Sequence, residues 1–269
     1  MPITKEIRDS DSLVIAITGF RNKLNLPVNE FFEQASLTSA SKIVVIDPSF
    51  RVGLSGIPPE YPTFFDIIEY LRNQIAEIPH KQLIVTGTSA GAHSAILFGH
   101  LLEADQVVSF APYTYLNRSK MSELKDPSLQ TMSRVIDGLE LLDDRVKSYF
   151  DLMNVVATWN GKTKYYIHVS KYHDWDRRRA NYLKGVDSLK VIEHPFSEHS
   201  VASRLAKFNR LAQCFEFPYQ HKITMKDLYL HLKNSSDGYS THLHKMIKLI
   251  LGKGWKAKKA FIKYFKTQS

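Results

Sequence analysis

Ser89 stands between two glycines in the segment Gly87-Thr88-Ser89-Ala90-Gly91, a spacing that can expose a serine as a nucleophile. A serine presented on a sharp turn between a strand and a helix needs small residues two positions before and after it. The same turn directs the next backbone N–H, here that of Ala90, from the first turn of a helix toward a developing oxyanion. The pattern predicts covalent catalysis by Ser89, and the alternative is a glycine turn without chemistry.

The elements around this segment have the pattern that the turn requires. Six short apolar runs are expected to be strands, at 13–17, 43–46, 83–85, 107–110, 165–169 and 191–192. Segments with helical apolar spacing, such as 64–71 and 92–102, lie between them. Continuous β-branched runs are typical of strands buried on both faces, and their alternation with helices predicts an α/β fold with a mostly parallel central sheet and flanking helices.

On these features, residues 12–212 resemble the α/β-hydrolase fold family of serine esterases and acyl hydrolases. The resemblance implies that an acid and then a histidine follow the serine in the chain. It also implies a second oxyanion N–H from the loop after the first long strand, and we expect Phe20, in Thr18-Gly19-Phe20-Arg21, to supply it. The His-Gly-Gly-Gly motif of some esterases is absent from the sequence.

Two aspartates compete for the role of the acid after the strand at 165–169. Asp176 is followed by Arg179-Ala180 and Leu183, which resembles the family pattern of an acid that opens a helix. Asp174 lies nearer the strand end, where the acid also occurs in the family. We favour Asp176 and expect Asp174 to be an N-cap.

Two histidines compete for the role of the base after the last strand. His199 precedes Ser200-Val201-Ala202, which is similar to the family's loop histidine before the final helix. His194 lies against the strand end before Pro195. We favour His199, although Glu198 stands where the family often has glycine. The resemblance then implies that Ser89 attacks, His199 moves the proton and Asp176 orients the imidazole.

A long connection separates the fourth and fifth expected strands. Residues 113–164 contain two helix-like segments, 132–142 and 146–155, and form a helical insertion before the acid-bearing strand. We interpret this insertion as a cap over the site, and the alternative is a pair of packing helices.

Charge divides the chain into a neutral body and a basic extension. Residues 221–269 hold 11 lysines and two acids, whereas residues 1–220 hold 25 basic and 25 acidic side chains. We therefore expect a catalytic domain at 1–215 and a basic, helical C-terminal extension at 216–269. The single cysteine, Cys214, excludes an internal disulfide, and we expect it to lie in the core.

Aromatic and basic residues alternate in the extension. A lysine-rich helix with Trp and Phe on one side suits an anionic membrane surface, and a solvated or packed helix is the alternative. The absence of arginine disfavours nucleic acid. The residues expected to contact the membrane or another polyanion are Trp255, Lys256, Lys258, Lys259, Phe261, Lys263 and Phe265.

These observations favour an esterase that cleaves or transfers an acyl group on an acylated sugar, polysaccharide or lipid. A serine peptidase, a thioesterase and a non-catalytic binding protein of the same fold are the alternatives. We expect no cofactor and no metal ion, because no acid or cysteine cluster accompanies the histidines of the extension. The sequence shows neither a signal peptide nor a long apolar run, so we expect a cytoplasmic location, peripheral to the inner face of the membrane if the extension binds there.

Overall fold

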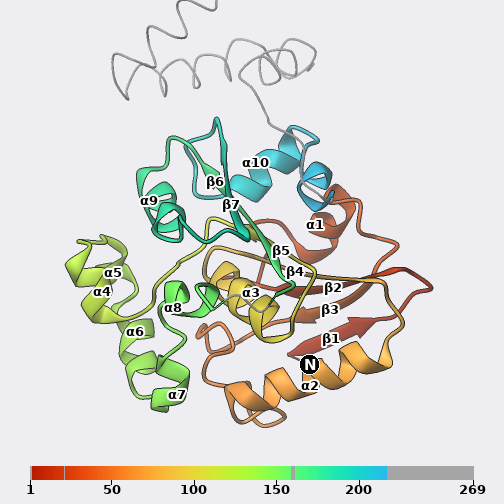
Figure 1. The fold of residues 1–269 in the computed structure, drawn as a ribbon, viewed down its shortest axis with the longest axis horizontal. Helices are drawn as coiled ribbons and strands as arrows, with labels where there is room; N and C mark the ends of the chain where they lie inside the picture. The colour runs from red at the N-terminus through yellow and green to blue at the C-terminus, as the bar shows by residue number, and fades with distance from the viewer. Residues whose placement is uncertain (1, 21, 159–160, 217–269) are drawn as a thin grey trace, which may run out of the picture.

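The computed structural model of the protein describes residues 2–20, 22–158 and 161–216 (Figure 1). Its seven-stranded sheet has the order β1-β3-β2-β4-β5-β6-β7. The strands are β1 Ile3–Glu6, β2 Ser12–Ile17, β3 Ser41–Val45, β4 Gln82–Thr88, β5 Gln106–Phe110, β6 Lys164–Ser170 and β7 Leu189–His194. Every neighbouring pair is parallel except β1 with β3. This architecture confirms the predicted fold class.

Both faces of the sheet are covered, which explains the continuous apolar runs. In β2, Leu13, Ile15 and Ile17 belong to one core cluster, whereas Val14 and Ala16 belong to another, because successive side chains of a strand point to opposite faces. The helices α2 (Phe64–Glu77) and α3 (Ala90–Leu101) contribute to the first cluster. The helices α1 (Val28–Gln34) and α10 (Val201–Lys207), with the 3₁₀ turn at Ala212–Phe215, contribute to the second.

The insertion at 113–164 consists of five short helices, which gather beside α9 (Asp174–Tyr182) and α3 (Figure 1). They are α4 Arg118–Glu123, α5 Ser128–Thr131, α6 Ser133–Glu140, α7 Asp144–Lys147 and α8 Leu152–Val156. The expectation of one helix over 146–155 is wrong. Asp151 ends the segment before α8, since its carboxylate accepts the N–H of Met153 as an N-cap and its backbone bridges to Tyr115.

Strand β1 is absent from the sequence-based expectation. Only Ile3 of its four residues is buried, so its charged sequence carries little apolar periodicity. Its position comes from antiparallel pairing with β3, from Ile3 opposite Val45 to Glu6 opposite Lys42.

The predicted basic extension lies outside the described residues, apart from Glu216. Among the helices that are described, none combines the length and the apolar character that a membrane span needs. Cys214 is a free, buried thiol whose pKa is raised by that burial.

Candidate active site

Ser89 occupies a strained turn between β4 and α3. Its backbone has φ 55° and ψ −122°, a conformation that costs a non-glycine residue about 1–3 kcal/mol. The Ser89 N–H donates to the carbonyl oxygen of Phe110 at 2.8 Å, and the Ser89 carbonyl oxygen accepts the N–H of Ala92 at 3.1 Å. The surrounding fold therefore holds the serine in this strained conformation at the end of the central strand β4.

The two glycines of the motif are needed because backbone passes close to them. A Cβ atom on Gly91 would lie 2.5 Å from the carbonyl oxygens of both Ile17 and Thr18. A Cβ atom on Gly87 would overlap the carbonyl group of Gly91. Any side chain at either position would force β4, α3 and the end of β2 apart.

Ser89, His199 and Asp176 form a continuous hydrogen-bonded chain. The Nε2 atom of His199 lies 2.8 Å from Oγ of Ser89, and its Nδ1 atom lies 2.8 Å from Oδ2 of Asp176. Since the carboxylate can only accept, Nδ1 carries the proton and Nε2 accepts from the serine hydroxyl. This arrangement can deprotonate Ser89 for attack on an acyl carbon.

The topology of the sheet explains how residues 110 positions apart meet. Ser89 follows β4, Asp176 lies in the first turn of α9 after β6, and His199 lies in the loop between β7 and α10. These parallel strands end at the same edge of the sheet, where crossover loops converge.

The structure places the alternative acid away from the other two residues. The side chain of Asp174 is 65% exposed and reaches Arg177 only at 3.7 Å, whereas that of Asp176 is fully buried. The expectation that Asp174 caps α9 is wrong, because the N-cap is His173, whose Nδ1 lies 3.3 Å from the backbone nitrogen of Asp176.

The alternative base is engaged in the core. His194 is buried, and its Nε2 lies 2.9 Å from Nδ1 of His168. The planes of the two rings differ by 10°, and their centres lie 5.2 Å apart. Burial lowers the pKa of His194 to about 4 and that of His168 well below the usual range.

The surroundings of Asp176 favour the ionised form of its carboxyl group. Burial raises the pKa of its carboxyl, but hydrogen bonds from His173 and His199 outweigh burial and hold the pKa below the usual range of an aspartate. The carboxylate is therefore ionised at neutral pH, and it can stabilise an imidazolium at His199.

One expected oxyanion donor, the Ala90 N–H, directly follows Ser89, and the loop that carries the other, Phe20, passes close to this turn. Ala90 is the first residue of α3, and no acceptor for its N–H is found in the described part of the chain. The loop of Phe20 passes close by, since a Cβ atom on Gly19 would lie 3.7 Å from Cβ of Ser89 and 2.7 Å from the carbonyl oxygen of Thr88. Gly19 is thus required for this approach, and the N–H of Phe20 likewise has no acceptor among the described residues.

Aromatic rings lie beside His199 and on the loop of Phe20. The ring of Phe20 meets that of Phe50 edge-on at 6.3 Å, and Phe50 is 44% exposed. The rings of Tyr113 and His173 lie 6.3 Å and 5.7 Å from that of His199. Sequence reasoning missed Phe50, Tyr113 and His173, although His173 lies next to the two competing aspartates.

Among the residues that the structure describes, two groups of side chains bring potential metal-ligating atoms within 4.8 Å of one another. One group is His173, Asp176 and His199, and the other is His168, His194 and Cys214. In both groups one ring nitrogen of each histidine already faces a partner of the same group. We assign neither group as a metal site.

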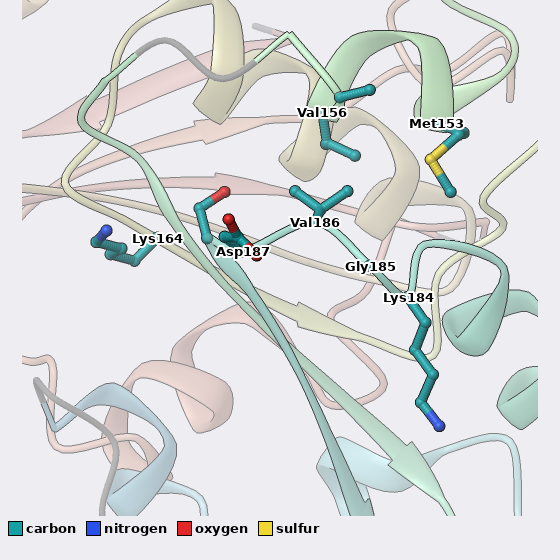
Figure 2. A pocket seen from close by; sticks show the side chains of 9 residues that line it. Met153, Val156, Lys164, Lys184, Gly185, Val186 and Asp187 are labelled. Carbon is teal, nitrogen blue, oxygen red and sulfur yellow. The ribbon is translucent and has the colours of Figure 1, made fainter.

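A separate cavity of about 440 Å³ lies beside α8 and the start of β6. Figure 2 shows Met153 and Val156 of α8 on one side of it and Val186 on the other. None of the three residues of the hydrogen-bonded chain lines it. This cavity is therefore not the space in which the Ser89 hydroxyl would react.

The sheet order, the strained serine after the central strand and the positions of the acid and the histidine define an α/β-hydrolase fold. The chain is similar to the capsule O-acetyltransferase of Neisseria meningitidis serogroup A, with a TM-score of 0.54, 12% identity, and coverage of 78% of this chain and 90% of that one. It is also similar to carboxyl esterase 2 of Tuber melanosporum, with a TM-score of 0.51, 12% identity and 80% of each chain covered. No protein-family model and no curated protein sequence matches the chain.

Proposed function

We propose that this protein is a serine-dependent acyl hydrolase or acyltransferase that works through an acyl-serine intermediate. The observation that carries the proposal is the chain of two 2.8 Å hydrogen bonds from Ser89 through His199 to the buried Asp176. The second observation is the strained backbone of Ser89 at the start of α3, next to the Ala90 N–H and close to the loop of Gly19 and Phe20.

In the proposed mechanism, Oγ of Ser89 attacks the carbonyl carbon of the acyl group while Nε2 of His199 takes the hydroxyl proton. The N–H groups of Ala90 and Phe20 would bind the oxyanion. The tetrahedral intermediate then collapses: the bond between the acyl carbon and the alcohol oxygen breaks, His199 gives its proton to that departing oxygen, and the acyl-serine remains. A water molecule or an acceptor hydroxyl then gives its proton to His199 and attacks the acyl-serine. The bond between the acyl carbon and Oγ of Ser89 breaks, Oγ takes the proton back from His199, and an acid or a new ester is released.

The substrate that we propose is an acylated sugar, polysaccharide or lipid. One structural neighbour is a capsule O-acetyltransferase and another a carboxyl esterase, and both kinds of reaction suit the same three side chains. A thioesterase or a serine peptidase is the alternative within the class. Turnover of matched acetyl esters, thioesters and peptides separates these reactions.

Intact-mass measurement after brief incubation with an activated acetyl ester tests the proposed intermediate. We expect one added acetyl group, located on the peptide that contains Ser89 and absent from Ser89→Ala. Partition of that group between water and an added sugar alcohol then distinguishes hydrolysis from transfer. Equal turnover of the ester by wild-type protein and by folded Ser89→Ala protein would refute the proposal.

For the extension at 216–269 we propose binding to an anionic membrane surface through Trp255, Phe261, Phe265 and the neighbouring lysines. Such binding would hold a cytoplasmic enzyme at the inner face of the membrane, near lipid-linked substrates. The support is the composition of residues 238–269, which hold eight lysines and no acidic side chain. Flotation with anionic and neutral liposomes, with and without residues 238–269, tests it, and equal flotation of both forms would contradict it.

A further inference from the structure

Arg179 lies in α9, one helical turn after Asp176, and its side chain is almost completely buried. Its Nε and Nη2 atoms donate to the two carboxylate oxygens of Asp126, at 2.8 Å and 2.6 Å. The side chains of Arg179 and Asp126 are 3% and 0% exposed. A planar guanidinium that binds both oxygens of a carboxylate in this way has a fixed orientation.

The remaining nitrogen of the same guanidinium faces the acid of the site. Nη1 of Arg179 lies 3.4 Å from Oδ1 of Asp176, whereas the other oxygen, Oδ2, faces His199. The guanidinium also lies 4.3 Å from the centre of the Tyr113 ring, and that ring adjoins His199. Arg179 therefore contacts Asp176 directly and the general base only through its neighbours.

Asp126 belongs to the insertion and is itself held in place. Tyr115 donates its hydroxyl to Oδ2 of Asp126 at 3.1 Å, and the Ser128 N–H donates to Oδ1 at 2.9 Å. Burial raises the pKa of Asp126, but its contacts with Arg179 and these groups outweigh burial and lower it. The hydroxyl of Thr114 donates to the backbone oxygen of Arg179 at 2.9 Å, so the insertion forms a second hydrogen-bonded contact with α9.

We propose that Arg179 and Asp126 are positioning residues that together hold Asp176 in the orientation required by His199 and set the charge beside it. The proposal rests on the proposed function of Ser89, His199 and Asp176. It assigns the insertion a role in aligning the site, in addition to any role in covering substrate.

The physical basis is a division of one positive charge between two carboxylates. Asp126 takes the two short contacts of the guanidinium, so Arg179 cannot pair fully with Asp176 and neutralise it. Asp176 then keeps enough negative charge to stabilise the imidazolium that forms at His199 during proton transfer. The groups facing His199 are Asp176, His173, Tyr113 and Ser89, and those facing Asp176 are His173, His199 and Arg179.

The two partners should therefore have opposite effects on the proton affinity of the site. Arg179→Met removes a positive charge near the Asp176–His199 pair, so His199 gains its proton at higher pH. Asp126→Asn leaves the guanidinium uncompensated, so His199 gains its proton at lower pH. We expect each displacement to be about half a pH unit or more for charges this close in a buried site.

The test is a pH titration of the His199 ring by NMR, with the signal assigned through its loss in His199→Gln, together with the acidic limb of kcat/KM. Arg178→Met is the matched control. It removes the same positive charge from the residue that directly precedes Arg179, and the Arg178 side chain is exposed and stacks on Trp175. We expect the control to titrate like the wild type. Shifts in the same direction for Arg179→Met and Asp126→Asn, or no shift in either, would overturn the proposal.

Either single variant leaves a buried charge without its partner and can fail to fold. The double variant Asp126→Asn/Arg179→Met removes both charges, so it should fold and titrate close to the wild type. We expect it to lose about tenfold or more in kcat with KM within about twofold, because the acid is no longer oriented. A wild-type kcat in the folded double variant would also overturn the proposal.

These outcomes are separable from failure of the proposed function. Opposite titration shifts in a protein without acyl chemistry at Ser89 would refute the enzyme and keep the charge arrangement. Turnover that depends on Ser89, with titrations unaffected by both single changes, would keep the enzyme and refute the role of Arg179 and Asp126.

Discussion

The ring of His173 lies beside the buried acid of the site, with Nδ1 3.0 Å from Oδ2 of Asp176. That oxygen is also the one that accepts the N–H of His199, so two histidines share one carboxylate oxygen. Only His199 places its other ring nitrogen at the serine hydroxyl in the described structure. The two histidines therefore have different relations to Ser89.

Substitution of the two histidines should separate these roles. His199→Ala removes the base and should lower kcat by a factor of about 10³ or more. His173→Ala removes the N-cap of α9 and should cost about 1 kcal/mol of stability and less than about tenfold in kcat. His173→Asn, which can still cap the helix, is the control and should recover most of the stability. Equal losses of kcat in His173→Ala and His199→Ala would contradict this assignment.

Substitution of the two aspartates of α9 should likewise have unequal effects on kcat. Asp176→Asn cannot hold the required tautomer of His199 and should reduce kcat by a factor of about 10⁴ with little change in KM. Asp174→Asn alters an exposed side chain and should stay within about twofold of the wild type. Steady-state kinetics with a short-chain acetyl ester measures both, and a larger loss from Asp174→Asn would identify the wrong acid.

Gly91 should not tolerate even an added methyl group. Gly91→Ala would place Cβ 2.5 Å from two backbone oxygens, which can move only if β2 and α3 separate. We expect a loss of about 3 kcal/mol or more in the free energy of unfolding. Gly185→Ala is the control, because nothing lies within 4 Å and only its φ of +101° disfavours alanine. Chemical denaturation compares the two variants, and equal stability losses would argue against the tight contact.

Three buried histidines predict a pH-dependent stability. Burial lowers the pKa of His93 and of His194 to about 4 and that of His168 well below the usual range. Each is neutral in the folded protein and takes up a proton near pH 6.5 when unfolded. Their stabilising contribution is therefore complete above about pH 6.5 and is lost as the pH falls toward 4.

Between about pH 6 and 5, each of these histidines should reduce the free energy of unfolding by up to about 1.4 kcal/mol per pH unit. Urea denaturation at several pH values measures the slope. His93→Gln keeps a donor for the carbonyl oxygen of Tyr113 and should remove one histidine's share of that slope. An unchanged slope in this variant would mean that His93 is not held neutral.

Much of the site was accessible from sequence because its parts are local. The turn at Ser89 uses small residues within two positions of it, and the strands around it are continuous apolar runs. Because the acid and then the base follow the serine along the chain, the candidates for the acid were reduced to Asp174 and Asp176, and those for the base to His194 and His199. The choice between Asp174 and Asp176 depends on rotation about α9, since two residues correspond to about 200° and place the two side chains on opposite sides of the helix.

Other parts could not be predicted because they depend on tertiary contacts. Asp126 and Arg179 lie 53 positions apart, and Asp126 belongs to an insertion of short helices with weak periodicity. Strand β1 is fixed by backbone pairing with β3 rather than by an apolar pattern of its own. A capped break at Asp151 likewise divided one expected helix into two.

The most direct test of the central claim is active-site labelling with a fluorophosphonate, which phosphonylates an activated serine hydroxyl. We expect wild-type protein to be labelled at Ser89, Ser89→Ala to be unlabelled, and His199→Ala and Asp176→Asn to be labelled much more slowly. Asp174→Asn and His194→Gln should react like the wild type if they remain folded. Absence of label on folded wild-type protein, or label that persists in Ser89→Ala, would contradict the assignment of Ser89 as an acyl-transfer nucleophile.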